Sequence, residues 1–168
     1  GSEMCIETGV PHEFGFTQSL FNFYNRPLSE ELWDAQVRAI REIADRESCV
    51  IVGRCADYIL RNHPYCYNFF IHAPLEDRIR RIVRRAPHLS DREAKELSNK
   101  YNKSRAAYYN FYTDKGWGEA ESYDLTIDSS ILGCEATADF IIEFIRKRQE
   151  AIKAQSVSYT HLRAHETT

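Results

Sequence analysis

Arginine side chains at three separated places are the residues of this sequence best suited to chemistry. Arg54 directly follows Gly53 at the end of an apolar run, and Arg105 precedes a pair of tyrosines in a predicted helix. Between them lie five arginines within eight residues: Arg78, Arg80, Arg81, Arg84 and Arg85. A guanidinium group is planar and permanently charged, so it can hold a phosphate or a carboxylate through two hydrogen bonds. The residue types therefore favour binding of an anion.

The position of Arg54 is typical of a ligand site. The apolar run Cys49–Val52 predicts a strand, and ligands of open α/β sheets bind beyond the carboxyl ends of the strands. Gly53 lets the chain turn sharply at that point. Taken alone, a surface arginine after a strand is the commoner explanation. Asp57 lies three residues later. We expect its carboxylate either to form an ion pair with Arg54 or Arg61, or to contact a polar substrate.

The arginine cluster permits three explanations. Arg78, Arg81 and Arg85 share one helix face by their spacing, while Ile79 and Ile82 point to the core. The basic face is either a solvated surface, a contact for nucleic-acid phosphates, or a group that stabilises charge on a transferring phosphoryl group. The local pattern does not choose among these three.

Arg105 falls on the predicted apolar stripe of its helix, one turn before Tyr108 and Tyr109. Either its aliphatic stem packs on aromatic rings while the charged head stays at the surface, or the tyrosines fix the guanidinium toward an anion. The segment Asp128-Ser129-Ser130 closes a strand and predicts a turn cap or a contact to a nucleotide base. No His, Cys and Asp cluster has metal-ligand spacing, and no G-x-S-x-G motif is present.

The composition indicates one globular domain. The chain has 168 residues, a net charge of -3 and 43% hydrophobic residues, which is enough to build a core. A slightly acidic total argues against general nucleic-acid binding. The five cysteines are scattered and form no Cys-x-x-Cys, so neither a zinc ribbon nor a disulfide framework is expected. We expect a cytoplasmic protein with no membrane partner.

Helices and strands alternate along the chain, which predicts the α/β class with a mostly parallel sheet. The predicted strands are Cys49–Val52, Tyr67–His72 and Tyr123–Ile127, and the predicted helices are Ser29–Glu47, Ala56–Arg61, Leu75–Arg85, a long helix capped by Ser90 and Glu93, and Glu135–Arg148. An unbroken apolar run such as Cys49–Val52 predicts a strand that is covered on both faces. In the first helix the inward residues are Trp33, Val37, Ile40 and Ala44, and in the last they are Thr137, Phe140, Ile141, Phe144 and Ile145.

The two ends differ from the rest. Residues 1–28 predict an irregular segment without an opening strand, residues 29–150 carry the domain, and residues 151–168 form a tail in which the helical pattern fades near Gln155. From Val157 to Thr167 the tail resembles one reading frame of the transposase mosaic-end adapter used in sequencing libraries. Residues 157–168 are therefore interpreted as a fusion scar and excluded from the fold.

Four separated motifs occur in order along the chain. They are Val50-Ile51-Val52-Gly53-Arg54-Cys55-Ala56-Asp57-Tyr58, Phe70-Ile71-His72-Ala73-Pro74, Lys103-x-Arg105-Ala106-x-Tyr108-Tyr109-Asn110-Phe111-Tyr112 and Tyr123-Asp124-Leu125-x-Ile127-Asp128-Ser129-Ser130. Together they closely resemble the cytidylate kinase-like family of P-loop nucleoside monophosphate kinases. The similarity extends from about Pro27 to Arg148.

The resemblance implies a P-loop NTPase-type, three-layer α/β/α fold with a helical lid at about residues 78–118. It also implies transfer of a phosphoryl group from ATP, with Mg²⁺, to a nucleoside monophosphate. On this analogy Arg54 holds the phosphate of the acceptor and Asp57 lies near the acceptor site. Arg78 and Arg81 would lie at the start of the lid, and Arg105 would reach the phosphates from its far arm. The resemblance thus implies that Arg78, Arg81 and Arg105 are catalytic.

Two positions depart from the pattern of cytidylate kinases. Cys55 stands where an acid often follows the Gly-Arg pair, and Asn102 stands where an acid commonly precedes the arginine of the lid helix. The base preference of the acceptor site is therefore open. Kinases of another small molecule on the same fold, and a non-catalytic module that binds anions or RNA through residues 78–85, are the alternatives.

The glycine-rich phosphate loop of the family has no counterpart among the 168 residues, because no G-x-x-x-x-G-K-[ST] or looser version occurs. The family's strand order places the strand before that loop between the strands at Cys49–Val52 and Tyr67–His72. We therefore expect a fragment that lacks the first strand and the cofactor-binding residues. We also expect that this polypeptide alone neither turns over ATP nor folds stably.

Overall fold

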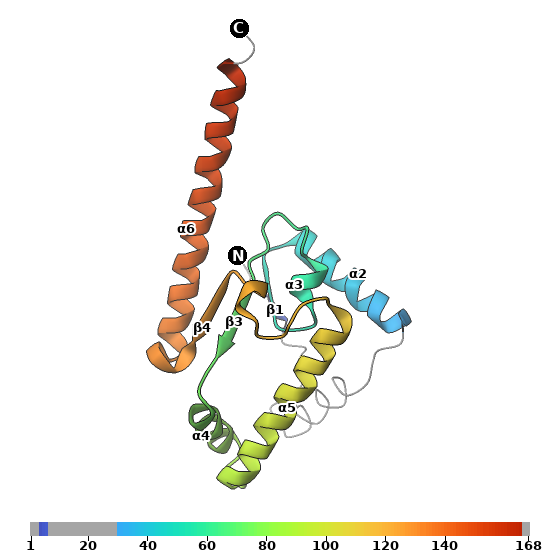
Figure 1. Cartoon of the computed structure of the whole chain (residues 1–168), viewed down its shortest axis with the longest axis vertical. Coiled ribbons are helices and arrows are strands. Elements are labelled where there is room, and N and C mark those ends of the chain that lie inside the picture. The colour runs from blue at the N-terminus through green and yellow to red at the C-terminus, as the bar shows by residue number, and fades with distance from the viewer. Residues whose placement is uncertain (1–3, 7–29, 166–168) are drawn as a thin grey trace. The chain divides into compact units, whose positions relative to one another are not determined.

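The computed structural model describes residues 4–6 and 30–165, and Figure 1 shows its helices and strands. In chain order these are β1 (Met4–Ile6), α2 (Glu30–Arg46), β2 (Cys49–Ile51), α3 (Ala56–Ile59), β3 (Phe69–His72), α4 (Leu75–Arg85), α5 (Asp91–Tyr112), the 3₁₀ turn η1 (Ala120–Ser122), β4 (Leu125–Asp128) and α6 (Ser129–His165). The described residues thus form a mixed α/β structure with more helix than strand, which confirms the predicted class.

Contacts divide the chain into two compact units. The first is Gly1–Phe70 with Leu75–Thr126, and the second is Ile71–Pro74 with Ile127–Thr168. The first unit contains the predicted site arginines and the two tyrosines that follow the last of them: Arg54, Arg78, Arg81, Arg105, Tyr108 and Tyr109. None of the described helices combines the length and apolar character needed to cross a membrane.

The strands form two separate two-stranded sheets, β1 with β2 and β3 with β4. β1 runs parallel to β2, with Met4 opposite Cys49 and Ile6 opposite Ile51. The prediction that no strand opens the chain is therefore wrong. Three residues are too few to show an apolar pattern, and β1 forms because pairing with β2 gives its backbone groups partners. The three-layer arrangement predicted by resemblance is not seen in these two small sheets.

β2 is covered on one face only. Ile51 packs against the helical core, whereas Val50 is 64% exposed and Val52, just after the strand, is 67% exposed. Side chains two positions apart lie on the same face of a strand, so both valines belong to the open face. The prediction that this run is covered on both faces is wrong, because the described residues place no helix over the valines.

The first core lies between α2 and α3. Ile40 of α2 and Ala56, Ile59 and Leu60 of the α3 region are buried together, and Trp33, Val37 and Ala44 pack against them. This confirms the stripe predicted from the period of α2. Glu30 and Glu31 lie in the first turn, where the helix dipole favours negative charge. The predicted cap, Ser29, lies outside the described residues.

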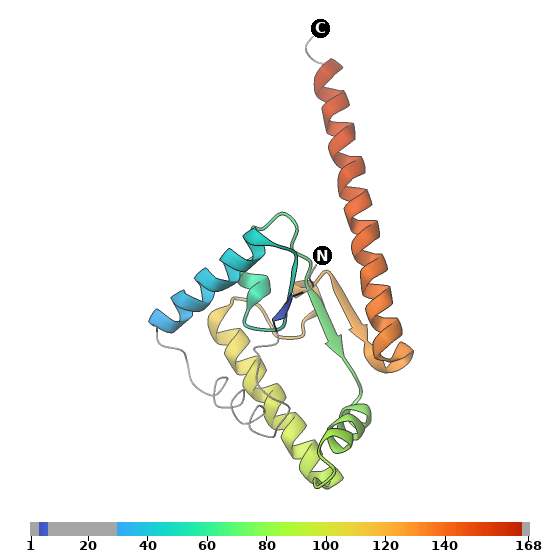
Figure 2. The same ribbon diagram turned by 180° about the vertical axis from the view of Figure 1, so that it is seen from behind.

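α4 and α5 pack against each other, as both views of the ribbon show (Figures 1 and 2). α4 has the predicted bounds, Leu75–Arg85, and α5 begins with the predicted capping box. The backbone nitrogen of Ser90 donates to Glu93 Oε2 at 2.8 Å, and the backbone nitrogen of Glu93 donates to Ser90 Oγ at 3.3 Å. The Ser90 hydroxyl also donates to Glu93 Oε2, at 2.6 Å, and this bond, together with the one from the Ser90 backbone nitrogen, lowers the pKa of the Glu93 carboxyl. Ala94 is fully buried, so its small side chain permits close packing.

α6 is longer than predicted. Its assigned span of 37 residues contains one non-helical residue, Gly133 (φ 77°, ψ 174°), and the helix after Gly133 continues to His165. The prediction that the helix fades near Gln155 is wrong, since no Gly or Pro interrupts the later residues and extending a helix adds one hydrogen bond per residue. Phe140, predicted to point inward, is 48% exposed, whereas Thr137 is buried and its hydroxyl donates to the Gly133 carbonyl.

We expect the isolated chain to be marginally stable. Two separate two-stranded sheets contribute little, since such ribbons are marginal on their own, and the open face of β2 leaves two valines in water. Thermal unfolding followed by far-UV circular dichroism should give a midpoint below about 45 °C, the low end for mesophilic domains. A cooperative transition above about 60 °C would contradict this prediction.

Candidate functional site

The chain leaves β2 through a strained turn. Gly53, Arg54 and Cys55 have φ angles of 71°, 62° and 53°, so three successive residues are left-handed and two of them carry side chains. Each such non-glycine residue costs on the order of 1–3 kcal/mol and persists only where its surroundings hold it. The backbone nitrogen of Ala56 closes the turn by donating to the Gly53 carbonyl at 3.2 Å. The strain lies where Arg54 was predicted to meet a ligand.

Two helices hold this turn through one amide side chain. Gln36 Nε2 on α2 donates to the backbone carbonyl of Arg54 at 3.1 Å. The hydroxyl of Tyr108 on α5 donates to Gln36 Oε1 at 3.3 Å. The carbonyl of Arg54 is thereby connected to both helices.

Asp57 lies at the start of α3 and is held by the neighbouring tyrosine of α5. The Tyr109 hydroxyl donates to Asp57 Oδ2 at 2.5 Å. A hydrogen bond joins the hydroxyls of Tyr109 and Tyr123, and Tyr123 accepts from the backbone nitrogen of Gly118 at 3.3 Å. Of the predicted partners of Asp57, Arg61 instead donates to the Tyr58 carbonyl at 2.7 Å and lies over the Tyr58 ring. Asp57 is thus oriented by a chain of hydroxyl groups.

An aromatic cluster buries the base of the turn. Cys55, Tyr108 and Tyr109 are its buried members, and Trp33, Tyr58, Tyr112 and Trp117 pack around them. Trp33 stacks on Tyr112 with ring centroids 4.2 Å apart, a contact that contributes about 0.5–1.5 kcal/mol beyond area burial. Burial raises the pKa of the Cys55 thiol to about 12, with a smaller contribution from the Asp57 charge. Burial also raises the pKa values of Tyr108 and Tyr109, and Asp57 adds to the second.

Arg105 lies on the exposed side of α5, so its predicted place on the buried stripe is wrong. The buried residues of α5 are Ala94, Ser98, Ser104, Tyr108 and Tyr109, and they turn Arg105 outward. Its guanidinium donates to Asn102 Oδ1 at 2.5 Å and lies 5.2 Å from the centre of the Trp117 ring. The tyrosines predicted to fix it contact Gln36 and Asp57 instead, and Trp117 takes that role.

Arg78 joins the two helices of the predicted lid. Its Nη1 donates to Ser98 Oγ of α5 at 2.8 Å. Arg81 lies one turn later on α4 and is partly buried. Ser98 and Tyr109 are 11 residues apart, which places the Arg78 contact about 16 Å along the α5 axis from the Asp57–Tyr109 pair. The convergence of Arg54, Arg78 and Arg105 on one anion therefore stays a prediction.

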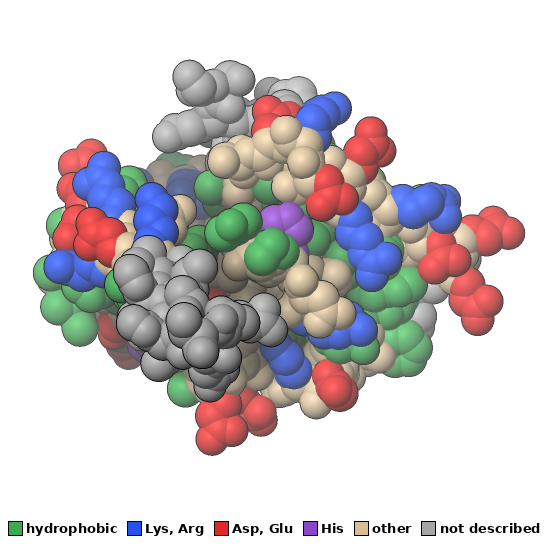
Figure 3. All heavy atoms as spheres, turned by 90° about the horizontal axis from the view of Figure 1, so that it is seen from above, with side chains coloured by type: hydrophobic (Ala, Val, Ile, Leu, Met, Phe, Trp, Pro, Cys, Tyr) green, Lys and Arg blue, Asp and Glu red, His purple; other side chains and the backbone are tan. Residues whose placement is uncertain are grey.

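Charges of both signs are interspersed on the face shown in Figure 3. Within α4, Arg80 pairs with Asp77, so one member of the arginine cluster is neutralised locally. At the other predicted polar segment, Asp128 Oδ1 accepts from the backbone nitrogen of Ser130 at 2.8 Å, and Ser129 Oγ donates to the His72 carbonyl at 3.1 Å. Asp128 thus acts as a turn cap, one of the two predicted roles.

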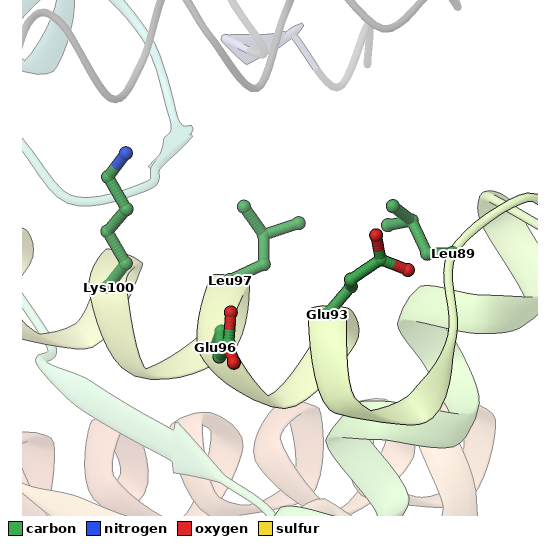
Figure 4. A pocket seen from close by; sticks show the side chains of 5 residues that line it. All are labelled: Leu89, Glu93, Glu96, Leu97 and Lys100. Atoms are coloured by element: carbon green, nitrogen blue, oxygen red, sulfur yellow. The ribbon is translucent and has the colours of Figure 1, made fainter.

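A separate open pocket of about 290 Å³ lies along the first half of α5. Figure 4 shows the side chains of Glu93, Leu97 and Lys100 projecting to one side of the helix, with Leu89 at its start. Its lining contains no arginine and none of the residues around the strained turn. We therefore place the candidate site at the turn, which geometry and strain single out, and not at this pocket.

The described residues do not form a metal cage, because no group of three or more His, Cys, Asp or Glu side chains lies close enough among them to hold an ion. Mg²⁺ commonly binds proteins through one or two carboxylates together with substrate phosphates.

A left-handed arginine after a parallel strand, three residues before a carboxylate that Tyr109 holds, is suited to bind a small phosphorylated molecule. Comparison with protein families agrees: residues 6–131 match the model of the cytidylate kinase-like family. The chain belongs to the cytidylate kinase-like family. Membership indicates a nucleotide kinase activity in general and the use of a small nucleotide substrate.

Among solved structures, a similar one is the crystal structure of an uncharacterized protein from Eubacterium ventriosum. It is 29% identical, with a TM-score of 0.67, and the match covers 84% of this chain and 78% of that chain. No curated protein matches the sequence. The similarity supports the mixed α/β fold of this family member.

Sequence reasoning missed Gln36. It lies between Trp33 and Ile40 on the helix face that packs inward, where apolar residues are expected. A polar side chain at such a position is costly unless it is hydrogen-bonded, so its presence there was the available signal. The Asp57–Tyr109 pair joins residues 52 positions apart, and no local pattern could have indicated it.

Proposed function

We propose that this chain carries the acceptor site and the lid of an ATP-dependent kinase that phosphorylates a nucleoside monophosphate, with cytidylate as the first candidate. The observation that carries the proposal is the strained turn at the carboxyl end of β2, which carries Arg54 three residues before Asp57. Two residues that carry side chains, Arg54 and Cys55, are held here in the left-handed conformation. Such strain indicates a functional role and not packing alone. Family membership supplies the class of reaction.

In this proposal Arg54 grips the phosphate of the acceptor through both arms of its guanidinium group. Asp57, oriented by Tyr109, accepts hydrogen bonds from the base or sugar, since an ionised carboxylate offers only acceptors. The amino group of cytosine is a donor, and uracil has a carbonyl at that position. Asp57 therefore favours CMP over UMP.

The lid arginines differ in their distance from this site. Arg105 is one helical turn from Tyr109 and its guanidinium is steadied by Trp117, so it is nearest to the acceptor. Arg78 and Arg81 lie near the other end of α5, and we propose that a movement of α4 and α5 brings them to the phosphates. Several fixed guanidinium groups would then stabilise the charge that develops as the phosphoryl group passes between two anions.

ATP would supply the phosphoryl group in this reaction, and Mg²⁺, when bound, would neutralise part of its charge. The P-loop that would cradle the ATP phosphates is not encoded in the 168 residues, which contain no glycine-rich motif of that form. We therefore propose that the chain by itself binds the acceptor but does not turn over ATP.

Calorimetric titration of the chain with CMP, UMP, AMP, GMP and inorganic phosphate tests this proposal. The titration is done at low temperature, with folding checked by circular dichroism. We expect CMP to bind with a Kd below about 1 mM, more tightly than UMP and than phosphate. We expect no formation of ADP or CDP when ATP and CMP are supplied together. Equal, weak binding of all five probes would exclude an acceptor site for nucleotides.

A single-stranded RNA oligonucleotide is the probe for the alternative module. If residues 78–85 served RNA, the oligonucleotide would bind more tightly than CMP and its affinity would fall steeply with salt. That outcome would replace the kinase proposal.

A further inference from the structure

Gln36 uses both ends of its amide in contacts to the candidate site. The carbonyl of Arg54 can only accept a hydrogen bond, so the NH₂ group of Gln36 must face it, at 3.1 Å. Gln36 Oε1 then faces the Tyr108 hydroxyl, at 3.3 Å. This pairing sets the orientation of the amide without ambiguity.

The contact falls at the most strained point of the described backbone. Arg54 and Cys55 are the two non-glycine residues with positive φ among the described residues. The carbonyl held by Gln36 belongs to the peptide plane between them, so its direction governs ψ of Arg54 and φ of Cys55. A hydrogen bond at this carbonyl therefore opposes relaxation of both residues toward ordinary conformations.

A packing role does not account for the choice of glutamine. The neighbours of Gln36 on this helix face are Trp33, Val37 and Ile40, and all of them pack on the first core. A methionine would fill a similar space without polar atoms to satisfy. The polar atoms of Gln36 are directed at the turn and at the helix that also holds Asp57.

We propose, building on the function proposed above, that Gln36 is a positioning residue for acceptor binding. It keeps the Gly53–Cys55 turn left-handed, and the turn holds the guanidinium of Arg54 toward the acceptor phosphate. Gln36 acts through Arg54 and does not touch the phosphate. Because Tyr108 and Tyr109 are adjacent, α5 fixes the Arg54 backbone and the Asp57 carboxylate together.

The variant Gln36→Met keeps the length of the side chain and removes both hydrogen bonds. The matched control is Glu42→Met, on the exposed side of the same helix. We expect Gln36→Met to weaken CMP binding about tenfold in calorimetry, near the upper end of the effect of one lost neutral hydrogen bond. Glu42→Met should change the affinity by less than about twofold.

A double-mutant cycle separates positioning from general packing. In the Arg54→Ala background, Gln36→Met should have no further effect on CMP affinity, since the group it positions is gone. Equal losses in both backgrounds, or no loss in either, would overturn the proposal. Gln36→Glu provides a second variant, because it retains an acceptor for Tyr108 and replaces the donor to the Arg54 carbonyl with a negatively charged oxygen.

Amide hydrogen exchange at Ala56 tests the positioning role of Gln36 without any nucleotide, so its result is independent of whether the chain binds CMP. The Ala56 nitrogen donates across the turn to Gly53, so its exchange reports whether the turn is held. We expect exchange about tenfold faster in Gln36→Met than in Glu42→Met. If the unaltered chain binds no nucleotide, the proposed function fails, and unchanged exchange at Ala56 would then overturn the positioning role as well.

Discussion

Replacing Arg54 with alanine is expected to weaken CMP binding at least about 100-fold. The guanidinium would make two charge-assisted hydrogen bonds to the phosphate, and such bonds contribute about 1.5–3 kcal/mol each. A loss of about 3 kcal/mol corresponds to roughly 100-fold in Kd. The measurement is calorimetric titration of the folded chain with CMP. Alanine and arginine both carry a Cβ, so the strain of the left-handed turn is the same in both proteins.

Two further variants sharpen this test. Arg54→Lys keeps the positive charge and loses the two-armed guanidinium group. Its affinity for CMP should therefore fall between that of the unaltered chain and that of Arg54→Ala. Arg41→Ala removes an exposed arginine from α2 and should leave CMP affinity within about twofold. If Arg54→Ala bound CMP as well as Arg41→Ala does, the assignment of Arg54 to the acceptor phosphate would be refuted.

The second large effect is a loss of stability in alkali. Folding raises the pKa of Cys55 from its ordinary value near 9 to about 12, because burial disfavours the thiolate. Unfolding therefore releases a proton above about pH 9, and stability falls as pH rises between these two values. The slope from one group is at most about 1.4 kcal/mol per pH unit, and residual solvent contact reduces it. Tyr108 and Tyr109, with raised pKa values, steepen the decline at higher pH.

Urea denaturation at a series of pH values measures this effect. Cys55→Ser removes the titrating thiol at nearly constant size and should flatten the decline just above about pH 9. Cys134→Ser, which changes an exposed thiol, should leave the profile unaltered. A stability that is constant from about pH 8 to pH 11, or an unchanged slope in Cys55→Ser, would show that this cluster is not buried in solution.

Local elements were predictable to the extent that a short-range period or a cap defines them. α4 has its predicted bounds because Pro74 precedes it and its apolar residues follow the helical period. The capping box of α5 and the inward stripe of α2 were also predicted, since each depends on residues within one or a few turns. β1 was missed because three residues carry too little pattern.

The candidate site was predictable in its residue types and not in its contacts. Glycine followed by arginine after an apolar run indicated the turn, but nothing in the run indicated that Arg54 and Cys55 both adopt positive φ. Arg105 was placed on the wrong face of α5, because tyrosines and serines form the buried side of that helix. Which face of a helix is buried depends on the surfaces that pack against it, and α5 packs against residues far away in the sequence.

The α/β class, the family and the residues able to bind an anion follow from local periodicity, side-chain chemistry and ordered motifs, all of which can be read along the chain. That Tyr109 holds Asp57, and that Gln36 with Tyr108 holds the backbone of Arg54, became visible from the packed helices alone. Those partners lie between 18 and 72 positions apart. Hydrogen bonds at such separations form when packing of whole helices brings the groups together, and no spacing rule along the chain encodes that approach.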